Sequence, residues 1–148
     1  MRGLFIVTAV AACAHAAPEG FVYTHRPDGV IVPASKGGDF YHDKQFHDFI
    51  TPTEADVARL EAALPAFIRE YDPKTDLDRR LPTYRRQYVG ILVQGHRRIW
   101  VHGFCRDSTN VDWRTQGFVV LDGGDCYFQA EYDIERHEFV SFATNGYG

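Results

Sequence analysis

The amino-acid sequence predicts an α+β fold in which one amphipathic helix packs on an antiparallel sheet of four to five strands. Apolar residues in the segment 51–71 recur at helical spacing behind a helix-start signal. The segments 84–105 and 117–143 instead alternate apolar and polar residues with a period of two, interrupted by glycine-containing turns. A helix followed by a run of strands is typical of a helical layer on an antiparallel sheet.

The first residues have the anatomy of an export signal, with a cationic second residue, an apolar run at 3–12 and small residues after it. Two processing routes are open. The Ala-His-Ala run at 14–16 matches the pattern for ordinary cleavage, which would make 1–16 the signal peptide. The run Val-Ala-Ala-Cys at 10–13 resembles a bacterial lipobox, in which Cys13 becomes lipidated. We therefore expect an exported protein, either soluble in the periplasm or medium or lipid-anchored through Cys13.

The chain has 148 residues, a single-domain length, and its hydrophobic fraction of 45% suits a packed core. We expect an irregular N-terminal arm at 17–50, in which Val30–Val32 forms at most a short edge strand, and one α+β domain at 51–148. The His42–Asp48 segment contains two histidines and two aspartates, but their spacing favours a solvated segment over a metal site. A formal net charge of −4 gives no reason to expect nucleic-acid binding.

The run Thr-Pro-Thr-Glu at 51–54 predicts a helix start, with Thr51 as the cap, proline at the first helical position and glutamate completing a capping box. Pro65 removes one backbone hydrogen bond and predicts a kink. The helix is expected at 52–71. Its apolar face follows a three-four spacing and consists of Val57, Leu60, Leu64, Phe67, Ile68 and Tyr71.

A charged connector at 74–83 leads to two predicted strands, 84–94 and 97–105, joined by a turn at Gly95-His96. Both faces of this hairpin carry apolar side chains, so we expect it to be central or covered on both sides. A polar loop at 106–116 follows.

A second hairpin is predicted at 117–133. The run 118–121 is apolar and β-branched, and the Asp-Gly-Gly-Asp run at 122–125 is typical of a tight turn that needs glycine. We interpret that run as a turn because it supplies too few oxygens for Ca²⁺. In the next strand the core face is Cys126, Phe128, Ala130 and Tyr132, and the expected solvent face is Tyr127, Gln129, Glu131 and Asp133. A last strand is expected at 138–143.

Two cysteines, Cys105 and Cys126, remain after the signal, and export favours a disulfide between them. In a plain meander the strand at 118–121 would separate them by two strand spacings, about 10 Å. A disulfide needs Cα atoms within about 7 Å. We therefore predict the disulfide, together with a strand order that is not strictly sequential.

Motifs of the common enzyme classes are absent from the sequence, including the serine elbow, the phosphate-binding and dinucleotide loops and the zinc-protease helix. His102 and Cys105 are three apart in a strand and point to opposite faces, which disfavours a nucleophile pair. We expect no catalytic residue, cofactor or metal. Among several arginine pairs, Arg85 and Arg106 are candidates for binding an anion at one end of the sheet, against the alternative of a balanced, solvated rim.

The segment YRRQYVGILVQGHRRIWVHGFC, the run DGGDCYFQAEYD and the terminal Asn-Gly resemble small exported bacterial proteins of uncharacterised function, over roughly Tyr84 to Gly146. The resemblance implies export and no particular activity. The predicted order of elements, a helix followed by an antiparallel meander, also looks like the cystatin-like and NTF2-like layouts, in which a helix packs on such a sheet.

We expect a non-enzymatic envelope protein that binds a protein partner, as an inhibitor or an immunity-type factor. Contact with a membrane is expected only through a lipid anchor. The alternative is a small-molecule binder or hydrolase with a pocket between helix and sheet, lined by Tyr88, Trp100, His102 and Tyr132. A deep pocket that holds His102 and an acid favours the alternative, whereas a filled interior and an exposed aromatic patch favour the first hypothesis.

Overall fold

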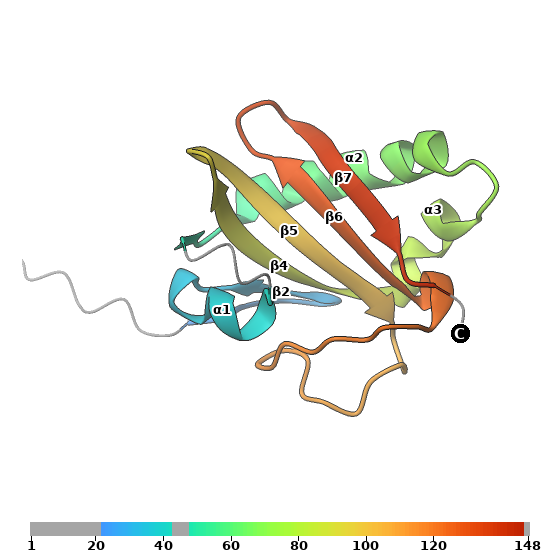
Figure 1. Ribbon diagram of the computed structural model, residues 1–148, viewed down its shortest axis with the longest axis horizontal. Helices are drawn as coiled ribbons and strands as arrows, with labels where there is room; N and C mark the ends of the chain where they lie inside the picture. The colour runs from blue at the N-terminus through green and yellow to red at the C-terminus, as the bar shows by residue number, and fades with distance from the viewer. Residues whose placement is uncertain (1–21, 43–47, 147–148) are drawn as a thin grey trace, which may run out of the picture.

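The computed structural model describes residues 22–42 and 48–146. The predictions for the segment 1–16, including Cys13, lie outside the described residues, as does the 43–47 part of the histidine- and aspartate-containing segment. Within the described residues, seven strands form one sheet in the order β1-β2-β4-β5-β6-β7, with β3 beside β4 (Figure 1). The α+β class and the mostly antiparallel sheet are confirmed, but the sheet has more than the four to five strands predicted.

The meander β4 to β7 is antiparallel throughout, whereas β2 pairs in parallel with β4. The helices are α1 (Gly37–Phe40), α2 (Glu54–Tyr71) and α3 (Leu77–Arg80). The strands are β1 (Thr24–Arg26), β2 (Gly29–Val32), β3 (Phe49–Ile50), β4 (Tyr84–Val93), β5 (His96–Cys105), β6 (Tyr127–Asp133) and β7 (Glu138–Thr144).

The additional strands come from the segment that the sequence analysis predicted to be an irregular arm. β2 is not an edge strand: it lies between β1 and β4, and all of its residues are buried. Its run of β-branched residues, Val30 to Val32, is typical of a strand that is covered on both faces.

The predicted hairpin of β4 and β5 is confirmed, with a register that runs from Tyr84 opposite Cys105 to Val93 opposite His96. Its turn lies one residue earlier than predicted, at Gln94-Gly95. Both residues have positive φ, 52° and 82°. A two-residue turn of this kind matches the twist of the flanking strands.

Helix α2 starts two residues later than predicted because Thr53, not Thr51, is its cap. The Thr53 hydroxyl accepts from the Asp56 backbone N–H at 3.1 Å and donates to the Asp56 carboxylate at 2.6 Å. The Thr51 hydroxyl instead accepts from the backbone N–H of Ala34 at 3.0 Å. Thr53 is therefore the N-cap of α2, although the capping rules applied to the sequence had assigned that position to Thr51.

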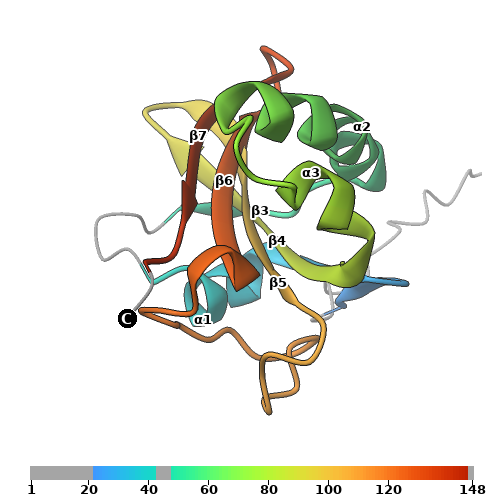
Figure 2. The same cartoon turned by 90° about the vertical axis from the view of Figure 1, so that its right-hand side faces the viewer.

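The α2 helix continues through Pro65 to Tyr71 and covers one face of the sheet (Figure 2). Four residues of its predicted face are fully buried, namely Val57, Leu60, Leu64 and Ile68. Tyr71, at the end of the helix, is 59% exposed. The predicted connector also contributes to this core, because Leu77 of α3 and Leu81 beyond it are buried in the same cluster.

Part of the opposite face, mainly over β2, β4 and the end of β5, is covered by α1 and by residues 109–122, which we call the strap (Figures 1 and 2). The prediction of a strand at 118–121 is wrong, since this part of the strap pairs with no strand. Gly123 and Gly124 do have positive φ, 92° and 57°, but they lead into a 3₁₀ turn (Gly124–Cys126) and not into a hairpin.

Because the strap is not a strand, β5 and β6 are direct neighbours. Cys105 at the end of β5 therefore meets Cys126 at the start of β6, with Cα atoms 5.0 Å apart, and the predicted disulfide is confirmed. The predicted departure from sequential strand order is wrong for this meander. The conflict between disulfide and meander arose only from the extra strand assigned to 118–121.

The faces of β6 also differ from the prediction, in part because Tyr127 packs against residues of the strap. The predicted core residues Phe128, Ala130 and Tyr132 are buried. Tyr127 and Asp133, expected in solvent, are buried too. The Tyr127 hydroxyl donates to the Ser108 carbonyl at 2.7 Å, and the Asp133 carboxylate accepts from the Arg136 backbone at 2.8 Å. Among the described residues, no helix has the length and apolar character that crossing a membrane requires.

Candidate functional site

The four residues predicted to line one pocket lie on opposite faces of the sheet. Tyr88 and Tyr132 belong to the filled core under α2. Tyr88 lies directly opposite Val101 of β5, and paired residues point to the same face of the sheet. Side chains alternate along a strand, so Trp100 and His102, on either side of Val101, point to the opposite face, toward the strap. The prediction of a pocket between helix and sheet is therefore wrong for this set of residues.

Tyr88 connects α2 to the sheet and also lines the second cavity described below. Its hydroxyl donates to Glu61 of α2 at 2.7 Å, and Glu61 also pairs with the buried Arg86 at 3.0 Å. Burial, together with the Glu61 charge, raises the pKa of the Tyr88 hydroxyl well above its usual range. The side chain stays neutral and connects helix to sheet.

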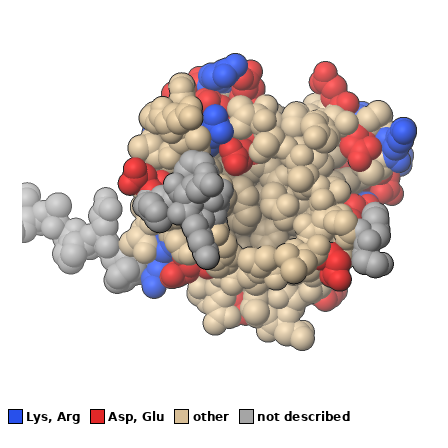
Figure 3. Space-filling model, in the orientation of Figure 1, with Lys and Arg blue, Asp and Glu red and all other residues tan. Residues whose placement is uncertain are grey.

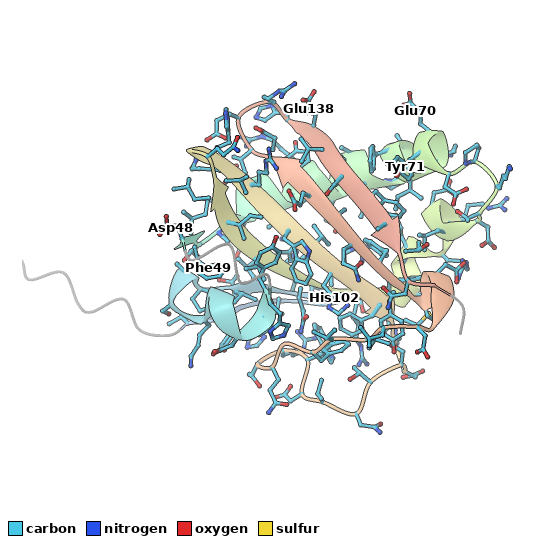
Figure 4. The ribbon with its side chains drawn as sticks, in the orientation of Figure 1. Asp48, Phe49, Glu70, Tyr71, His102 and Glu138 are labelled. Carbon is cyan, nitrogen blue, oxygen red and sulfur yellow. A yellow bond between two sulfur atoms is a disulfide. The ribbon has the colours of Figure 1, made fainter. Side chains whose placement is uncertain are left out.

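Trp100 and His102 line a cavity of about 270 Å³ between the sheet, α1 and the strap, which we call the aromatic pocket. The centre of this face is hollowed and uncharged (Figure 3), and His102 lies near its middle (Figure 4). No carboxylate lies among the described residues of its lining. These are Phe40, Tyr41, His42, Trp100, His102, Phe118, Val119, Val120, Gln129 and Asn145.

Aromatic rings form the walls of the pocket. The Tyr41 and Trp100 rings meet edge to face with centroids 5.2 Å apart, and Trp100 stacks on His102 at 5.5 Å. Phe118 of the strap lies 4.9 Å from the His102 ring on the other side. Such walls favour planar, apolar groups, because each ring offers a face or an edge to a ligand ring.

A glycine allows the strap to approach α1 closely enough to form this wall. A Cβ at Gly117 would lie 2.3 Å from the Asp39 carbonyl oxygen and 2.4 Å from the Phe40 Cα. Both are backbone atoms, which cannot move aside as a side chain can. Gly117 therefore places Phe118 and its neighbours against the pocket.

Two amide side chains hold the strap over the sheet. Gln87 of β4 donates to the carbonyls of Trp113 and Gln116 at 2.7 and 2.9 Å. Asn145, just after β7, donates to the carbonyls of Val120 and Asp122 at 2.7 and 3.0 Å. The strap has no strand partner, so these side chains satisfy carbonyls that a sheet would otherwise pair.

His102 is the one titratable residue at the base of the described pocket lining, 3% exposed. Its Nδ1 lies 3.3 Å from Gln87 Oε1. Burial, with a smaller contribution from the nearby His42, lowers the pKa of the imidazole to about 4. The ring is therefore neutral at neutral pH. The hydrogen-bond partner of its Nδ1 is an amide, and the imidazole lacks the carboxylate partner that would make it a stronger base.

The two arginines predicted to bind an anion have separate partners in the structure. Arg85 lies over the Trp113 ring, with its guanidinium carbon 5.2 Å from the centroid. Arg106 pairs with Asp28 at 2.8 Å. Anion binding by these residues stays a hypothesis, but each guanidinium already contacts a ring or a carboxylate.

A second cavity, about 450 Å³, is lined by residues of α2 and of the sheet, with Tyr88 as its one residue from the predicted pocket set; sequence reasoning missed its charged residues. It has three arginines, Arg26, Arg79 and Arg86, and three acids, Asp28, Glu61 and Asp78. Glu61 pairs with Arg86 of the lining at 3.0 Å, whereas Asp28 and Asp78 pair at 2.8 and 2.9 Å with Arg106 and Arg69, which lie outside it. All three acids of this cavity are therefore engaged in ion pairs.

In the part of the chain that the structure describes, no group of three or more histidine, cysteine or acidic residues could hold a metal ion. Comparisons with protein-family models, with curated proteins and with solved structures found no match for this chain. The aromatic pocket is therefore the basis for inferring function.

Proposed function

We propose that this protein is an exported, non-enzymatic binding protein that takes a small planar ligand in the aromatic pocket. One observation carries the proposal: a cavity of about 270 Å³ whose walls are aromatic rings and whose base is a buried, neutral imidazole. A cavity of roughly 150 Å³ already accepts benzene in another protein. This pocket therefore has room for a ring with a substituent.

Hydrolysis is the less supported use of the same pocket. A hydrolase needs a nucleophile or an activated water, with a base that is oriented by a third group. The described lining contains no serine, cysteine or carboxylate. The Nδ1 partner of His102 is the neutral amide of Gln87. These features support binding over catalysis.

Small aromatic probes test the proposal by nuclear magnetic resonance. The chain has two tryptophans, Trp100 in the pocket and Trp113 in the strap but outside the pocket lining, so their indole N–H signals separate pocket binding from general effects. Phenol, anisole and benzamide are expected to shift the Trp100 signal in a saturable way. The absence of saturable shifts at Trp100 with all three probes would contradict the proposal.

A matched pair of variants sharpens this experiment. Phe118→Ala removes a pocket wall and should weaken probe binding about tenfold, the effect of losing one ring contact and its buried area. Phe139→Ala removes a partly buried ring on the α2 face and should leave probe affinity unchanged.

Export is the part of the proposal that rests on the first sixteen residues and on the resemblance over Tyr84 to Gly146. The disulfide is compatible with an oxidising compartment. Mass spectrometry of the processed protein is expected to find either a lipidated terminus at Cys13 or a free terminus at Ala17. An unprocessed Met1 in the mature fraction would contradict both routes.

A protein partner is the second candidate function, favoured by an aromatic patch beside β7. β7 is the last strand of the described sheet, and the Phe67 and Phe139 rings stack next to it with centroids 4.5 Å apart. Tyr71 contacts the same cluster and projects beside β7 (Figure 4). Capture from an envelope extract by the wild type, lost in Tyr71→Glu, would support this function; equal capture by both would count against this patch.

A further inference from the structure

The orientation of the Gln87 side chain is fixed by what it contacts. Its Nε2 lies 2.7 Å from the Trp113 carbonyl and 2.9 Å from the Gln116 carbonyl. Carbonyl oxygens only accept hydrogen bonds, so the amide nitrogen must face the strap and use both of its protons there. The amide oxygen is then the atom that faces His102.

This orientation determines the tautomer of His102. An amide oxygen only accepts, so the imidazole Nδ1 at 3.3 Å must carry the proton. In a neutral ring the other nitrogen, Nε2, then has a free lone pair. Among the described residues, no hydrogen-bond partner contacts Nε2, and the ring lines the aromatic pocket.

The neighbouring strand β6 contributes a second hydrogen-bond acceptor, the side-chain oxygen of Gln129. Gln129 stands directly opposite His102 in the β5–β6 register. Asn145 donates its amide protons to two strap carbonyls, so its oxygen is the acceptor for Gln129 Nε2 at 3.2 Å. The Gln129 Oε1 has no partner among the described residues. The sheet thus presents two acceptors side by side and no charged group.

We propose that the ligand of the aromatic pocket is a neutral planar molecule that donates a hydrogen bond from N–H or O–H to His102 Nε2, as phenols, primary amides and N–H heteroaromatics do. The proposal rests on the binding function proposed above and names its ligand class. A carboxylate is disfavoured at this position because it would bring its lone pairs against those of Nε2 and lose hydration without gaining a donor from His102. The aromatic walls hold the ring of the ligand.

Phenol and anisole are the probes that test this class. They share a ring, but anisole has a methyl group in place of the donating proton and is the more apolar of the two. One neutral hydrogen bond corresponds to about a three- to tenfold difference in affinity. The wild type is expected to bind phenol tighter than anisole by about this factor, as followed at the Trp100 indole signal.

His102→Phe should reverse the preference, because an apolar ring in place of the imidazole favours the more apolar probe. His96→Phe is the matched control: His96 is exposed at the start of β5, and its replacement should keep the phenol preference. Equal or tighter binding of anisole by the wild type would overturn the donor class while leaving the binding function intact. Saturable shifts with neither probe nor with benzamide would instead overturn the binding function itself.

A measurement on the wild type keeps the test valid if His102→Phe does not fold. The side-chain ¹⁵N signals of His102 should report a protonated Nδ1 and an unprotonated Nε2, and saturation with phenol should move the Nε2 signal toward that of a hydrogen-bonded nitrogen. A proton on Nε2 in the free protein, or an Nε2 signal unmoved by bound phenol, would overturn the proposal.

Discussion

The two faces of the central sheet are formed by the same strands, yet they differ in what they leave unfilled. The α2 face has a tightly packed apolar core, in which even Gly103 is covered by the Phe128 ring: a Cβ there would lie 2.1 Å from ring atoms. Its cavity of about 450 Å³ lies beside that core and is lined by arginines and acids. The strap face instead contains the polar row of Gln87 and His102 and a cavity of about 270 Å³. A helix pairs its own backbone groups, whereas a strap without regular structure needs side-chain amides to pair its carbonyls. Those amides bring polar groups into the interior.

The comparison predicts that the α2 face carries most of the stability. Leu64→Ala should lower the free energy of unfolding by about 2–5 kcal/mol, because Leu64 is fully buried and a cavity remains. Leu121→Ala, on the strap and 89% exposed, should change it by less than about 0.5 kcal/mol. Urea denaturation measures both. A similar loss in the two variants would contradict the assignment of the core.

The disulfide joins the entrance of the strap to its exit, so its removal tests how far the strap depends on a covalent link. The double variant Cys105→Ser, Cys126→Ser should lose about 3 kcal/mol, the value expected from opening a loop with a sequence separation of 21. Urea denaturation with and without reductant checks this. Reductant should destabilise the wild type and leave the variant unchanged, and an equal response would show that the bond is not formed.

The neutral imidazole makes the strap face sensitive to acid. His102 has a pKa of about 4 in the folded protein against 6.5 for the ordinary side chain, so the unfolded chain binds the proton more tightly between these values. Stability from this residue is therefore complete above pH 6.5 and is lost as the pH falls toward 4. Between pH 7 and pH 5 the loss should be about 2 kcal/mol.

Other groups also titrate between pH 5 and pH 7, so the contribution of His102 is measured by comparing the wild type with a variant that lacks it. The pH dependence of the free energy of unfolding should be shallower in His102→Phe than in the wild type. His96→Phe, with an exposed histidine removed, should retain the wild-type slope. Parallel curves for the wild type and His102→Phe would show that the pKa of this imidazole is not lowered.

The smallest expected effect concerns the amide that holds the far end of the strap. Asn145→Ala removes two side-chain hydrogen bonds to the carbonyls of Val120 and Asp122 and should cost about 1 kcal/mol, because the strap carbonyls can partly turn to water. Amide hydrogen exchange across 117–122 should accelerate in this variant. Thr144→Ala, at an exposed neighbouring position, should leave that exchange unchanged.

The sequence by itself determined the elements whose signal is local and repeated. The apolar stripe of α2, the β4–β5 hairpin and the core face of β6 are periodic, and burial of one face follows from such a period. The cysteine pair could also be predicted, because an even count of cysteines after a predicted export signal favours a disulfide. The observed start of α2 lies two residues after the predicted one, because Thr51 and Thr53 are both suitable caps and only the fold decides between them.

Only the tertiary structure decided the roles of segments with weak local signals. The run 118–121 is β-branched and apolar, but it packs on the sheet and not within it, because β5 and β6 already pair with each other. Val30–Val32 became an internal strand because β4 offered it a partner. The candidate site was half predicted: Trp100 and His102 line the pocket, while Tyr88 and Tyr132 face the core. Which face of a strand holds a cavity depends on what covers it, and here the cover comes from residues far away in the sequence.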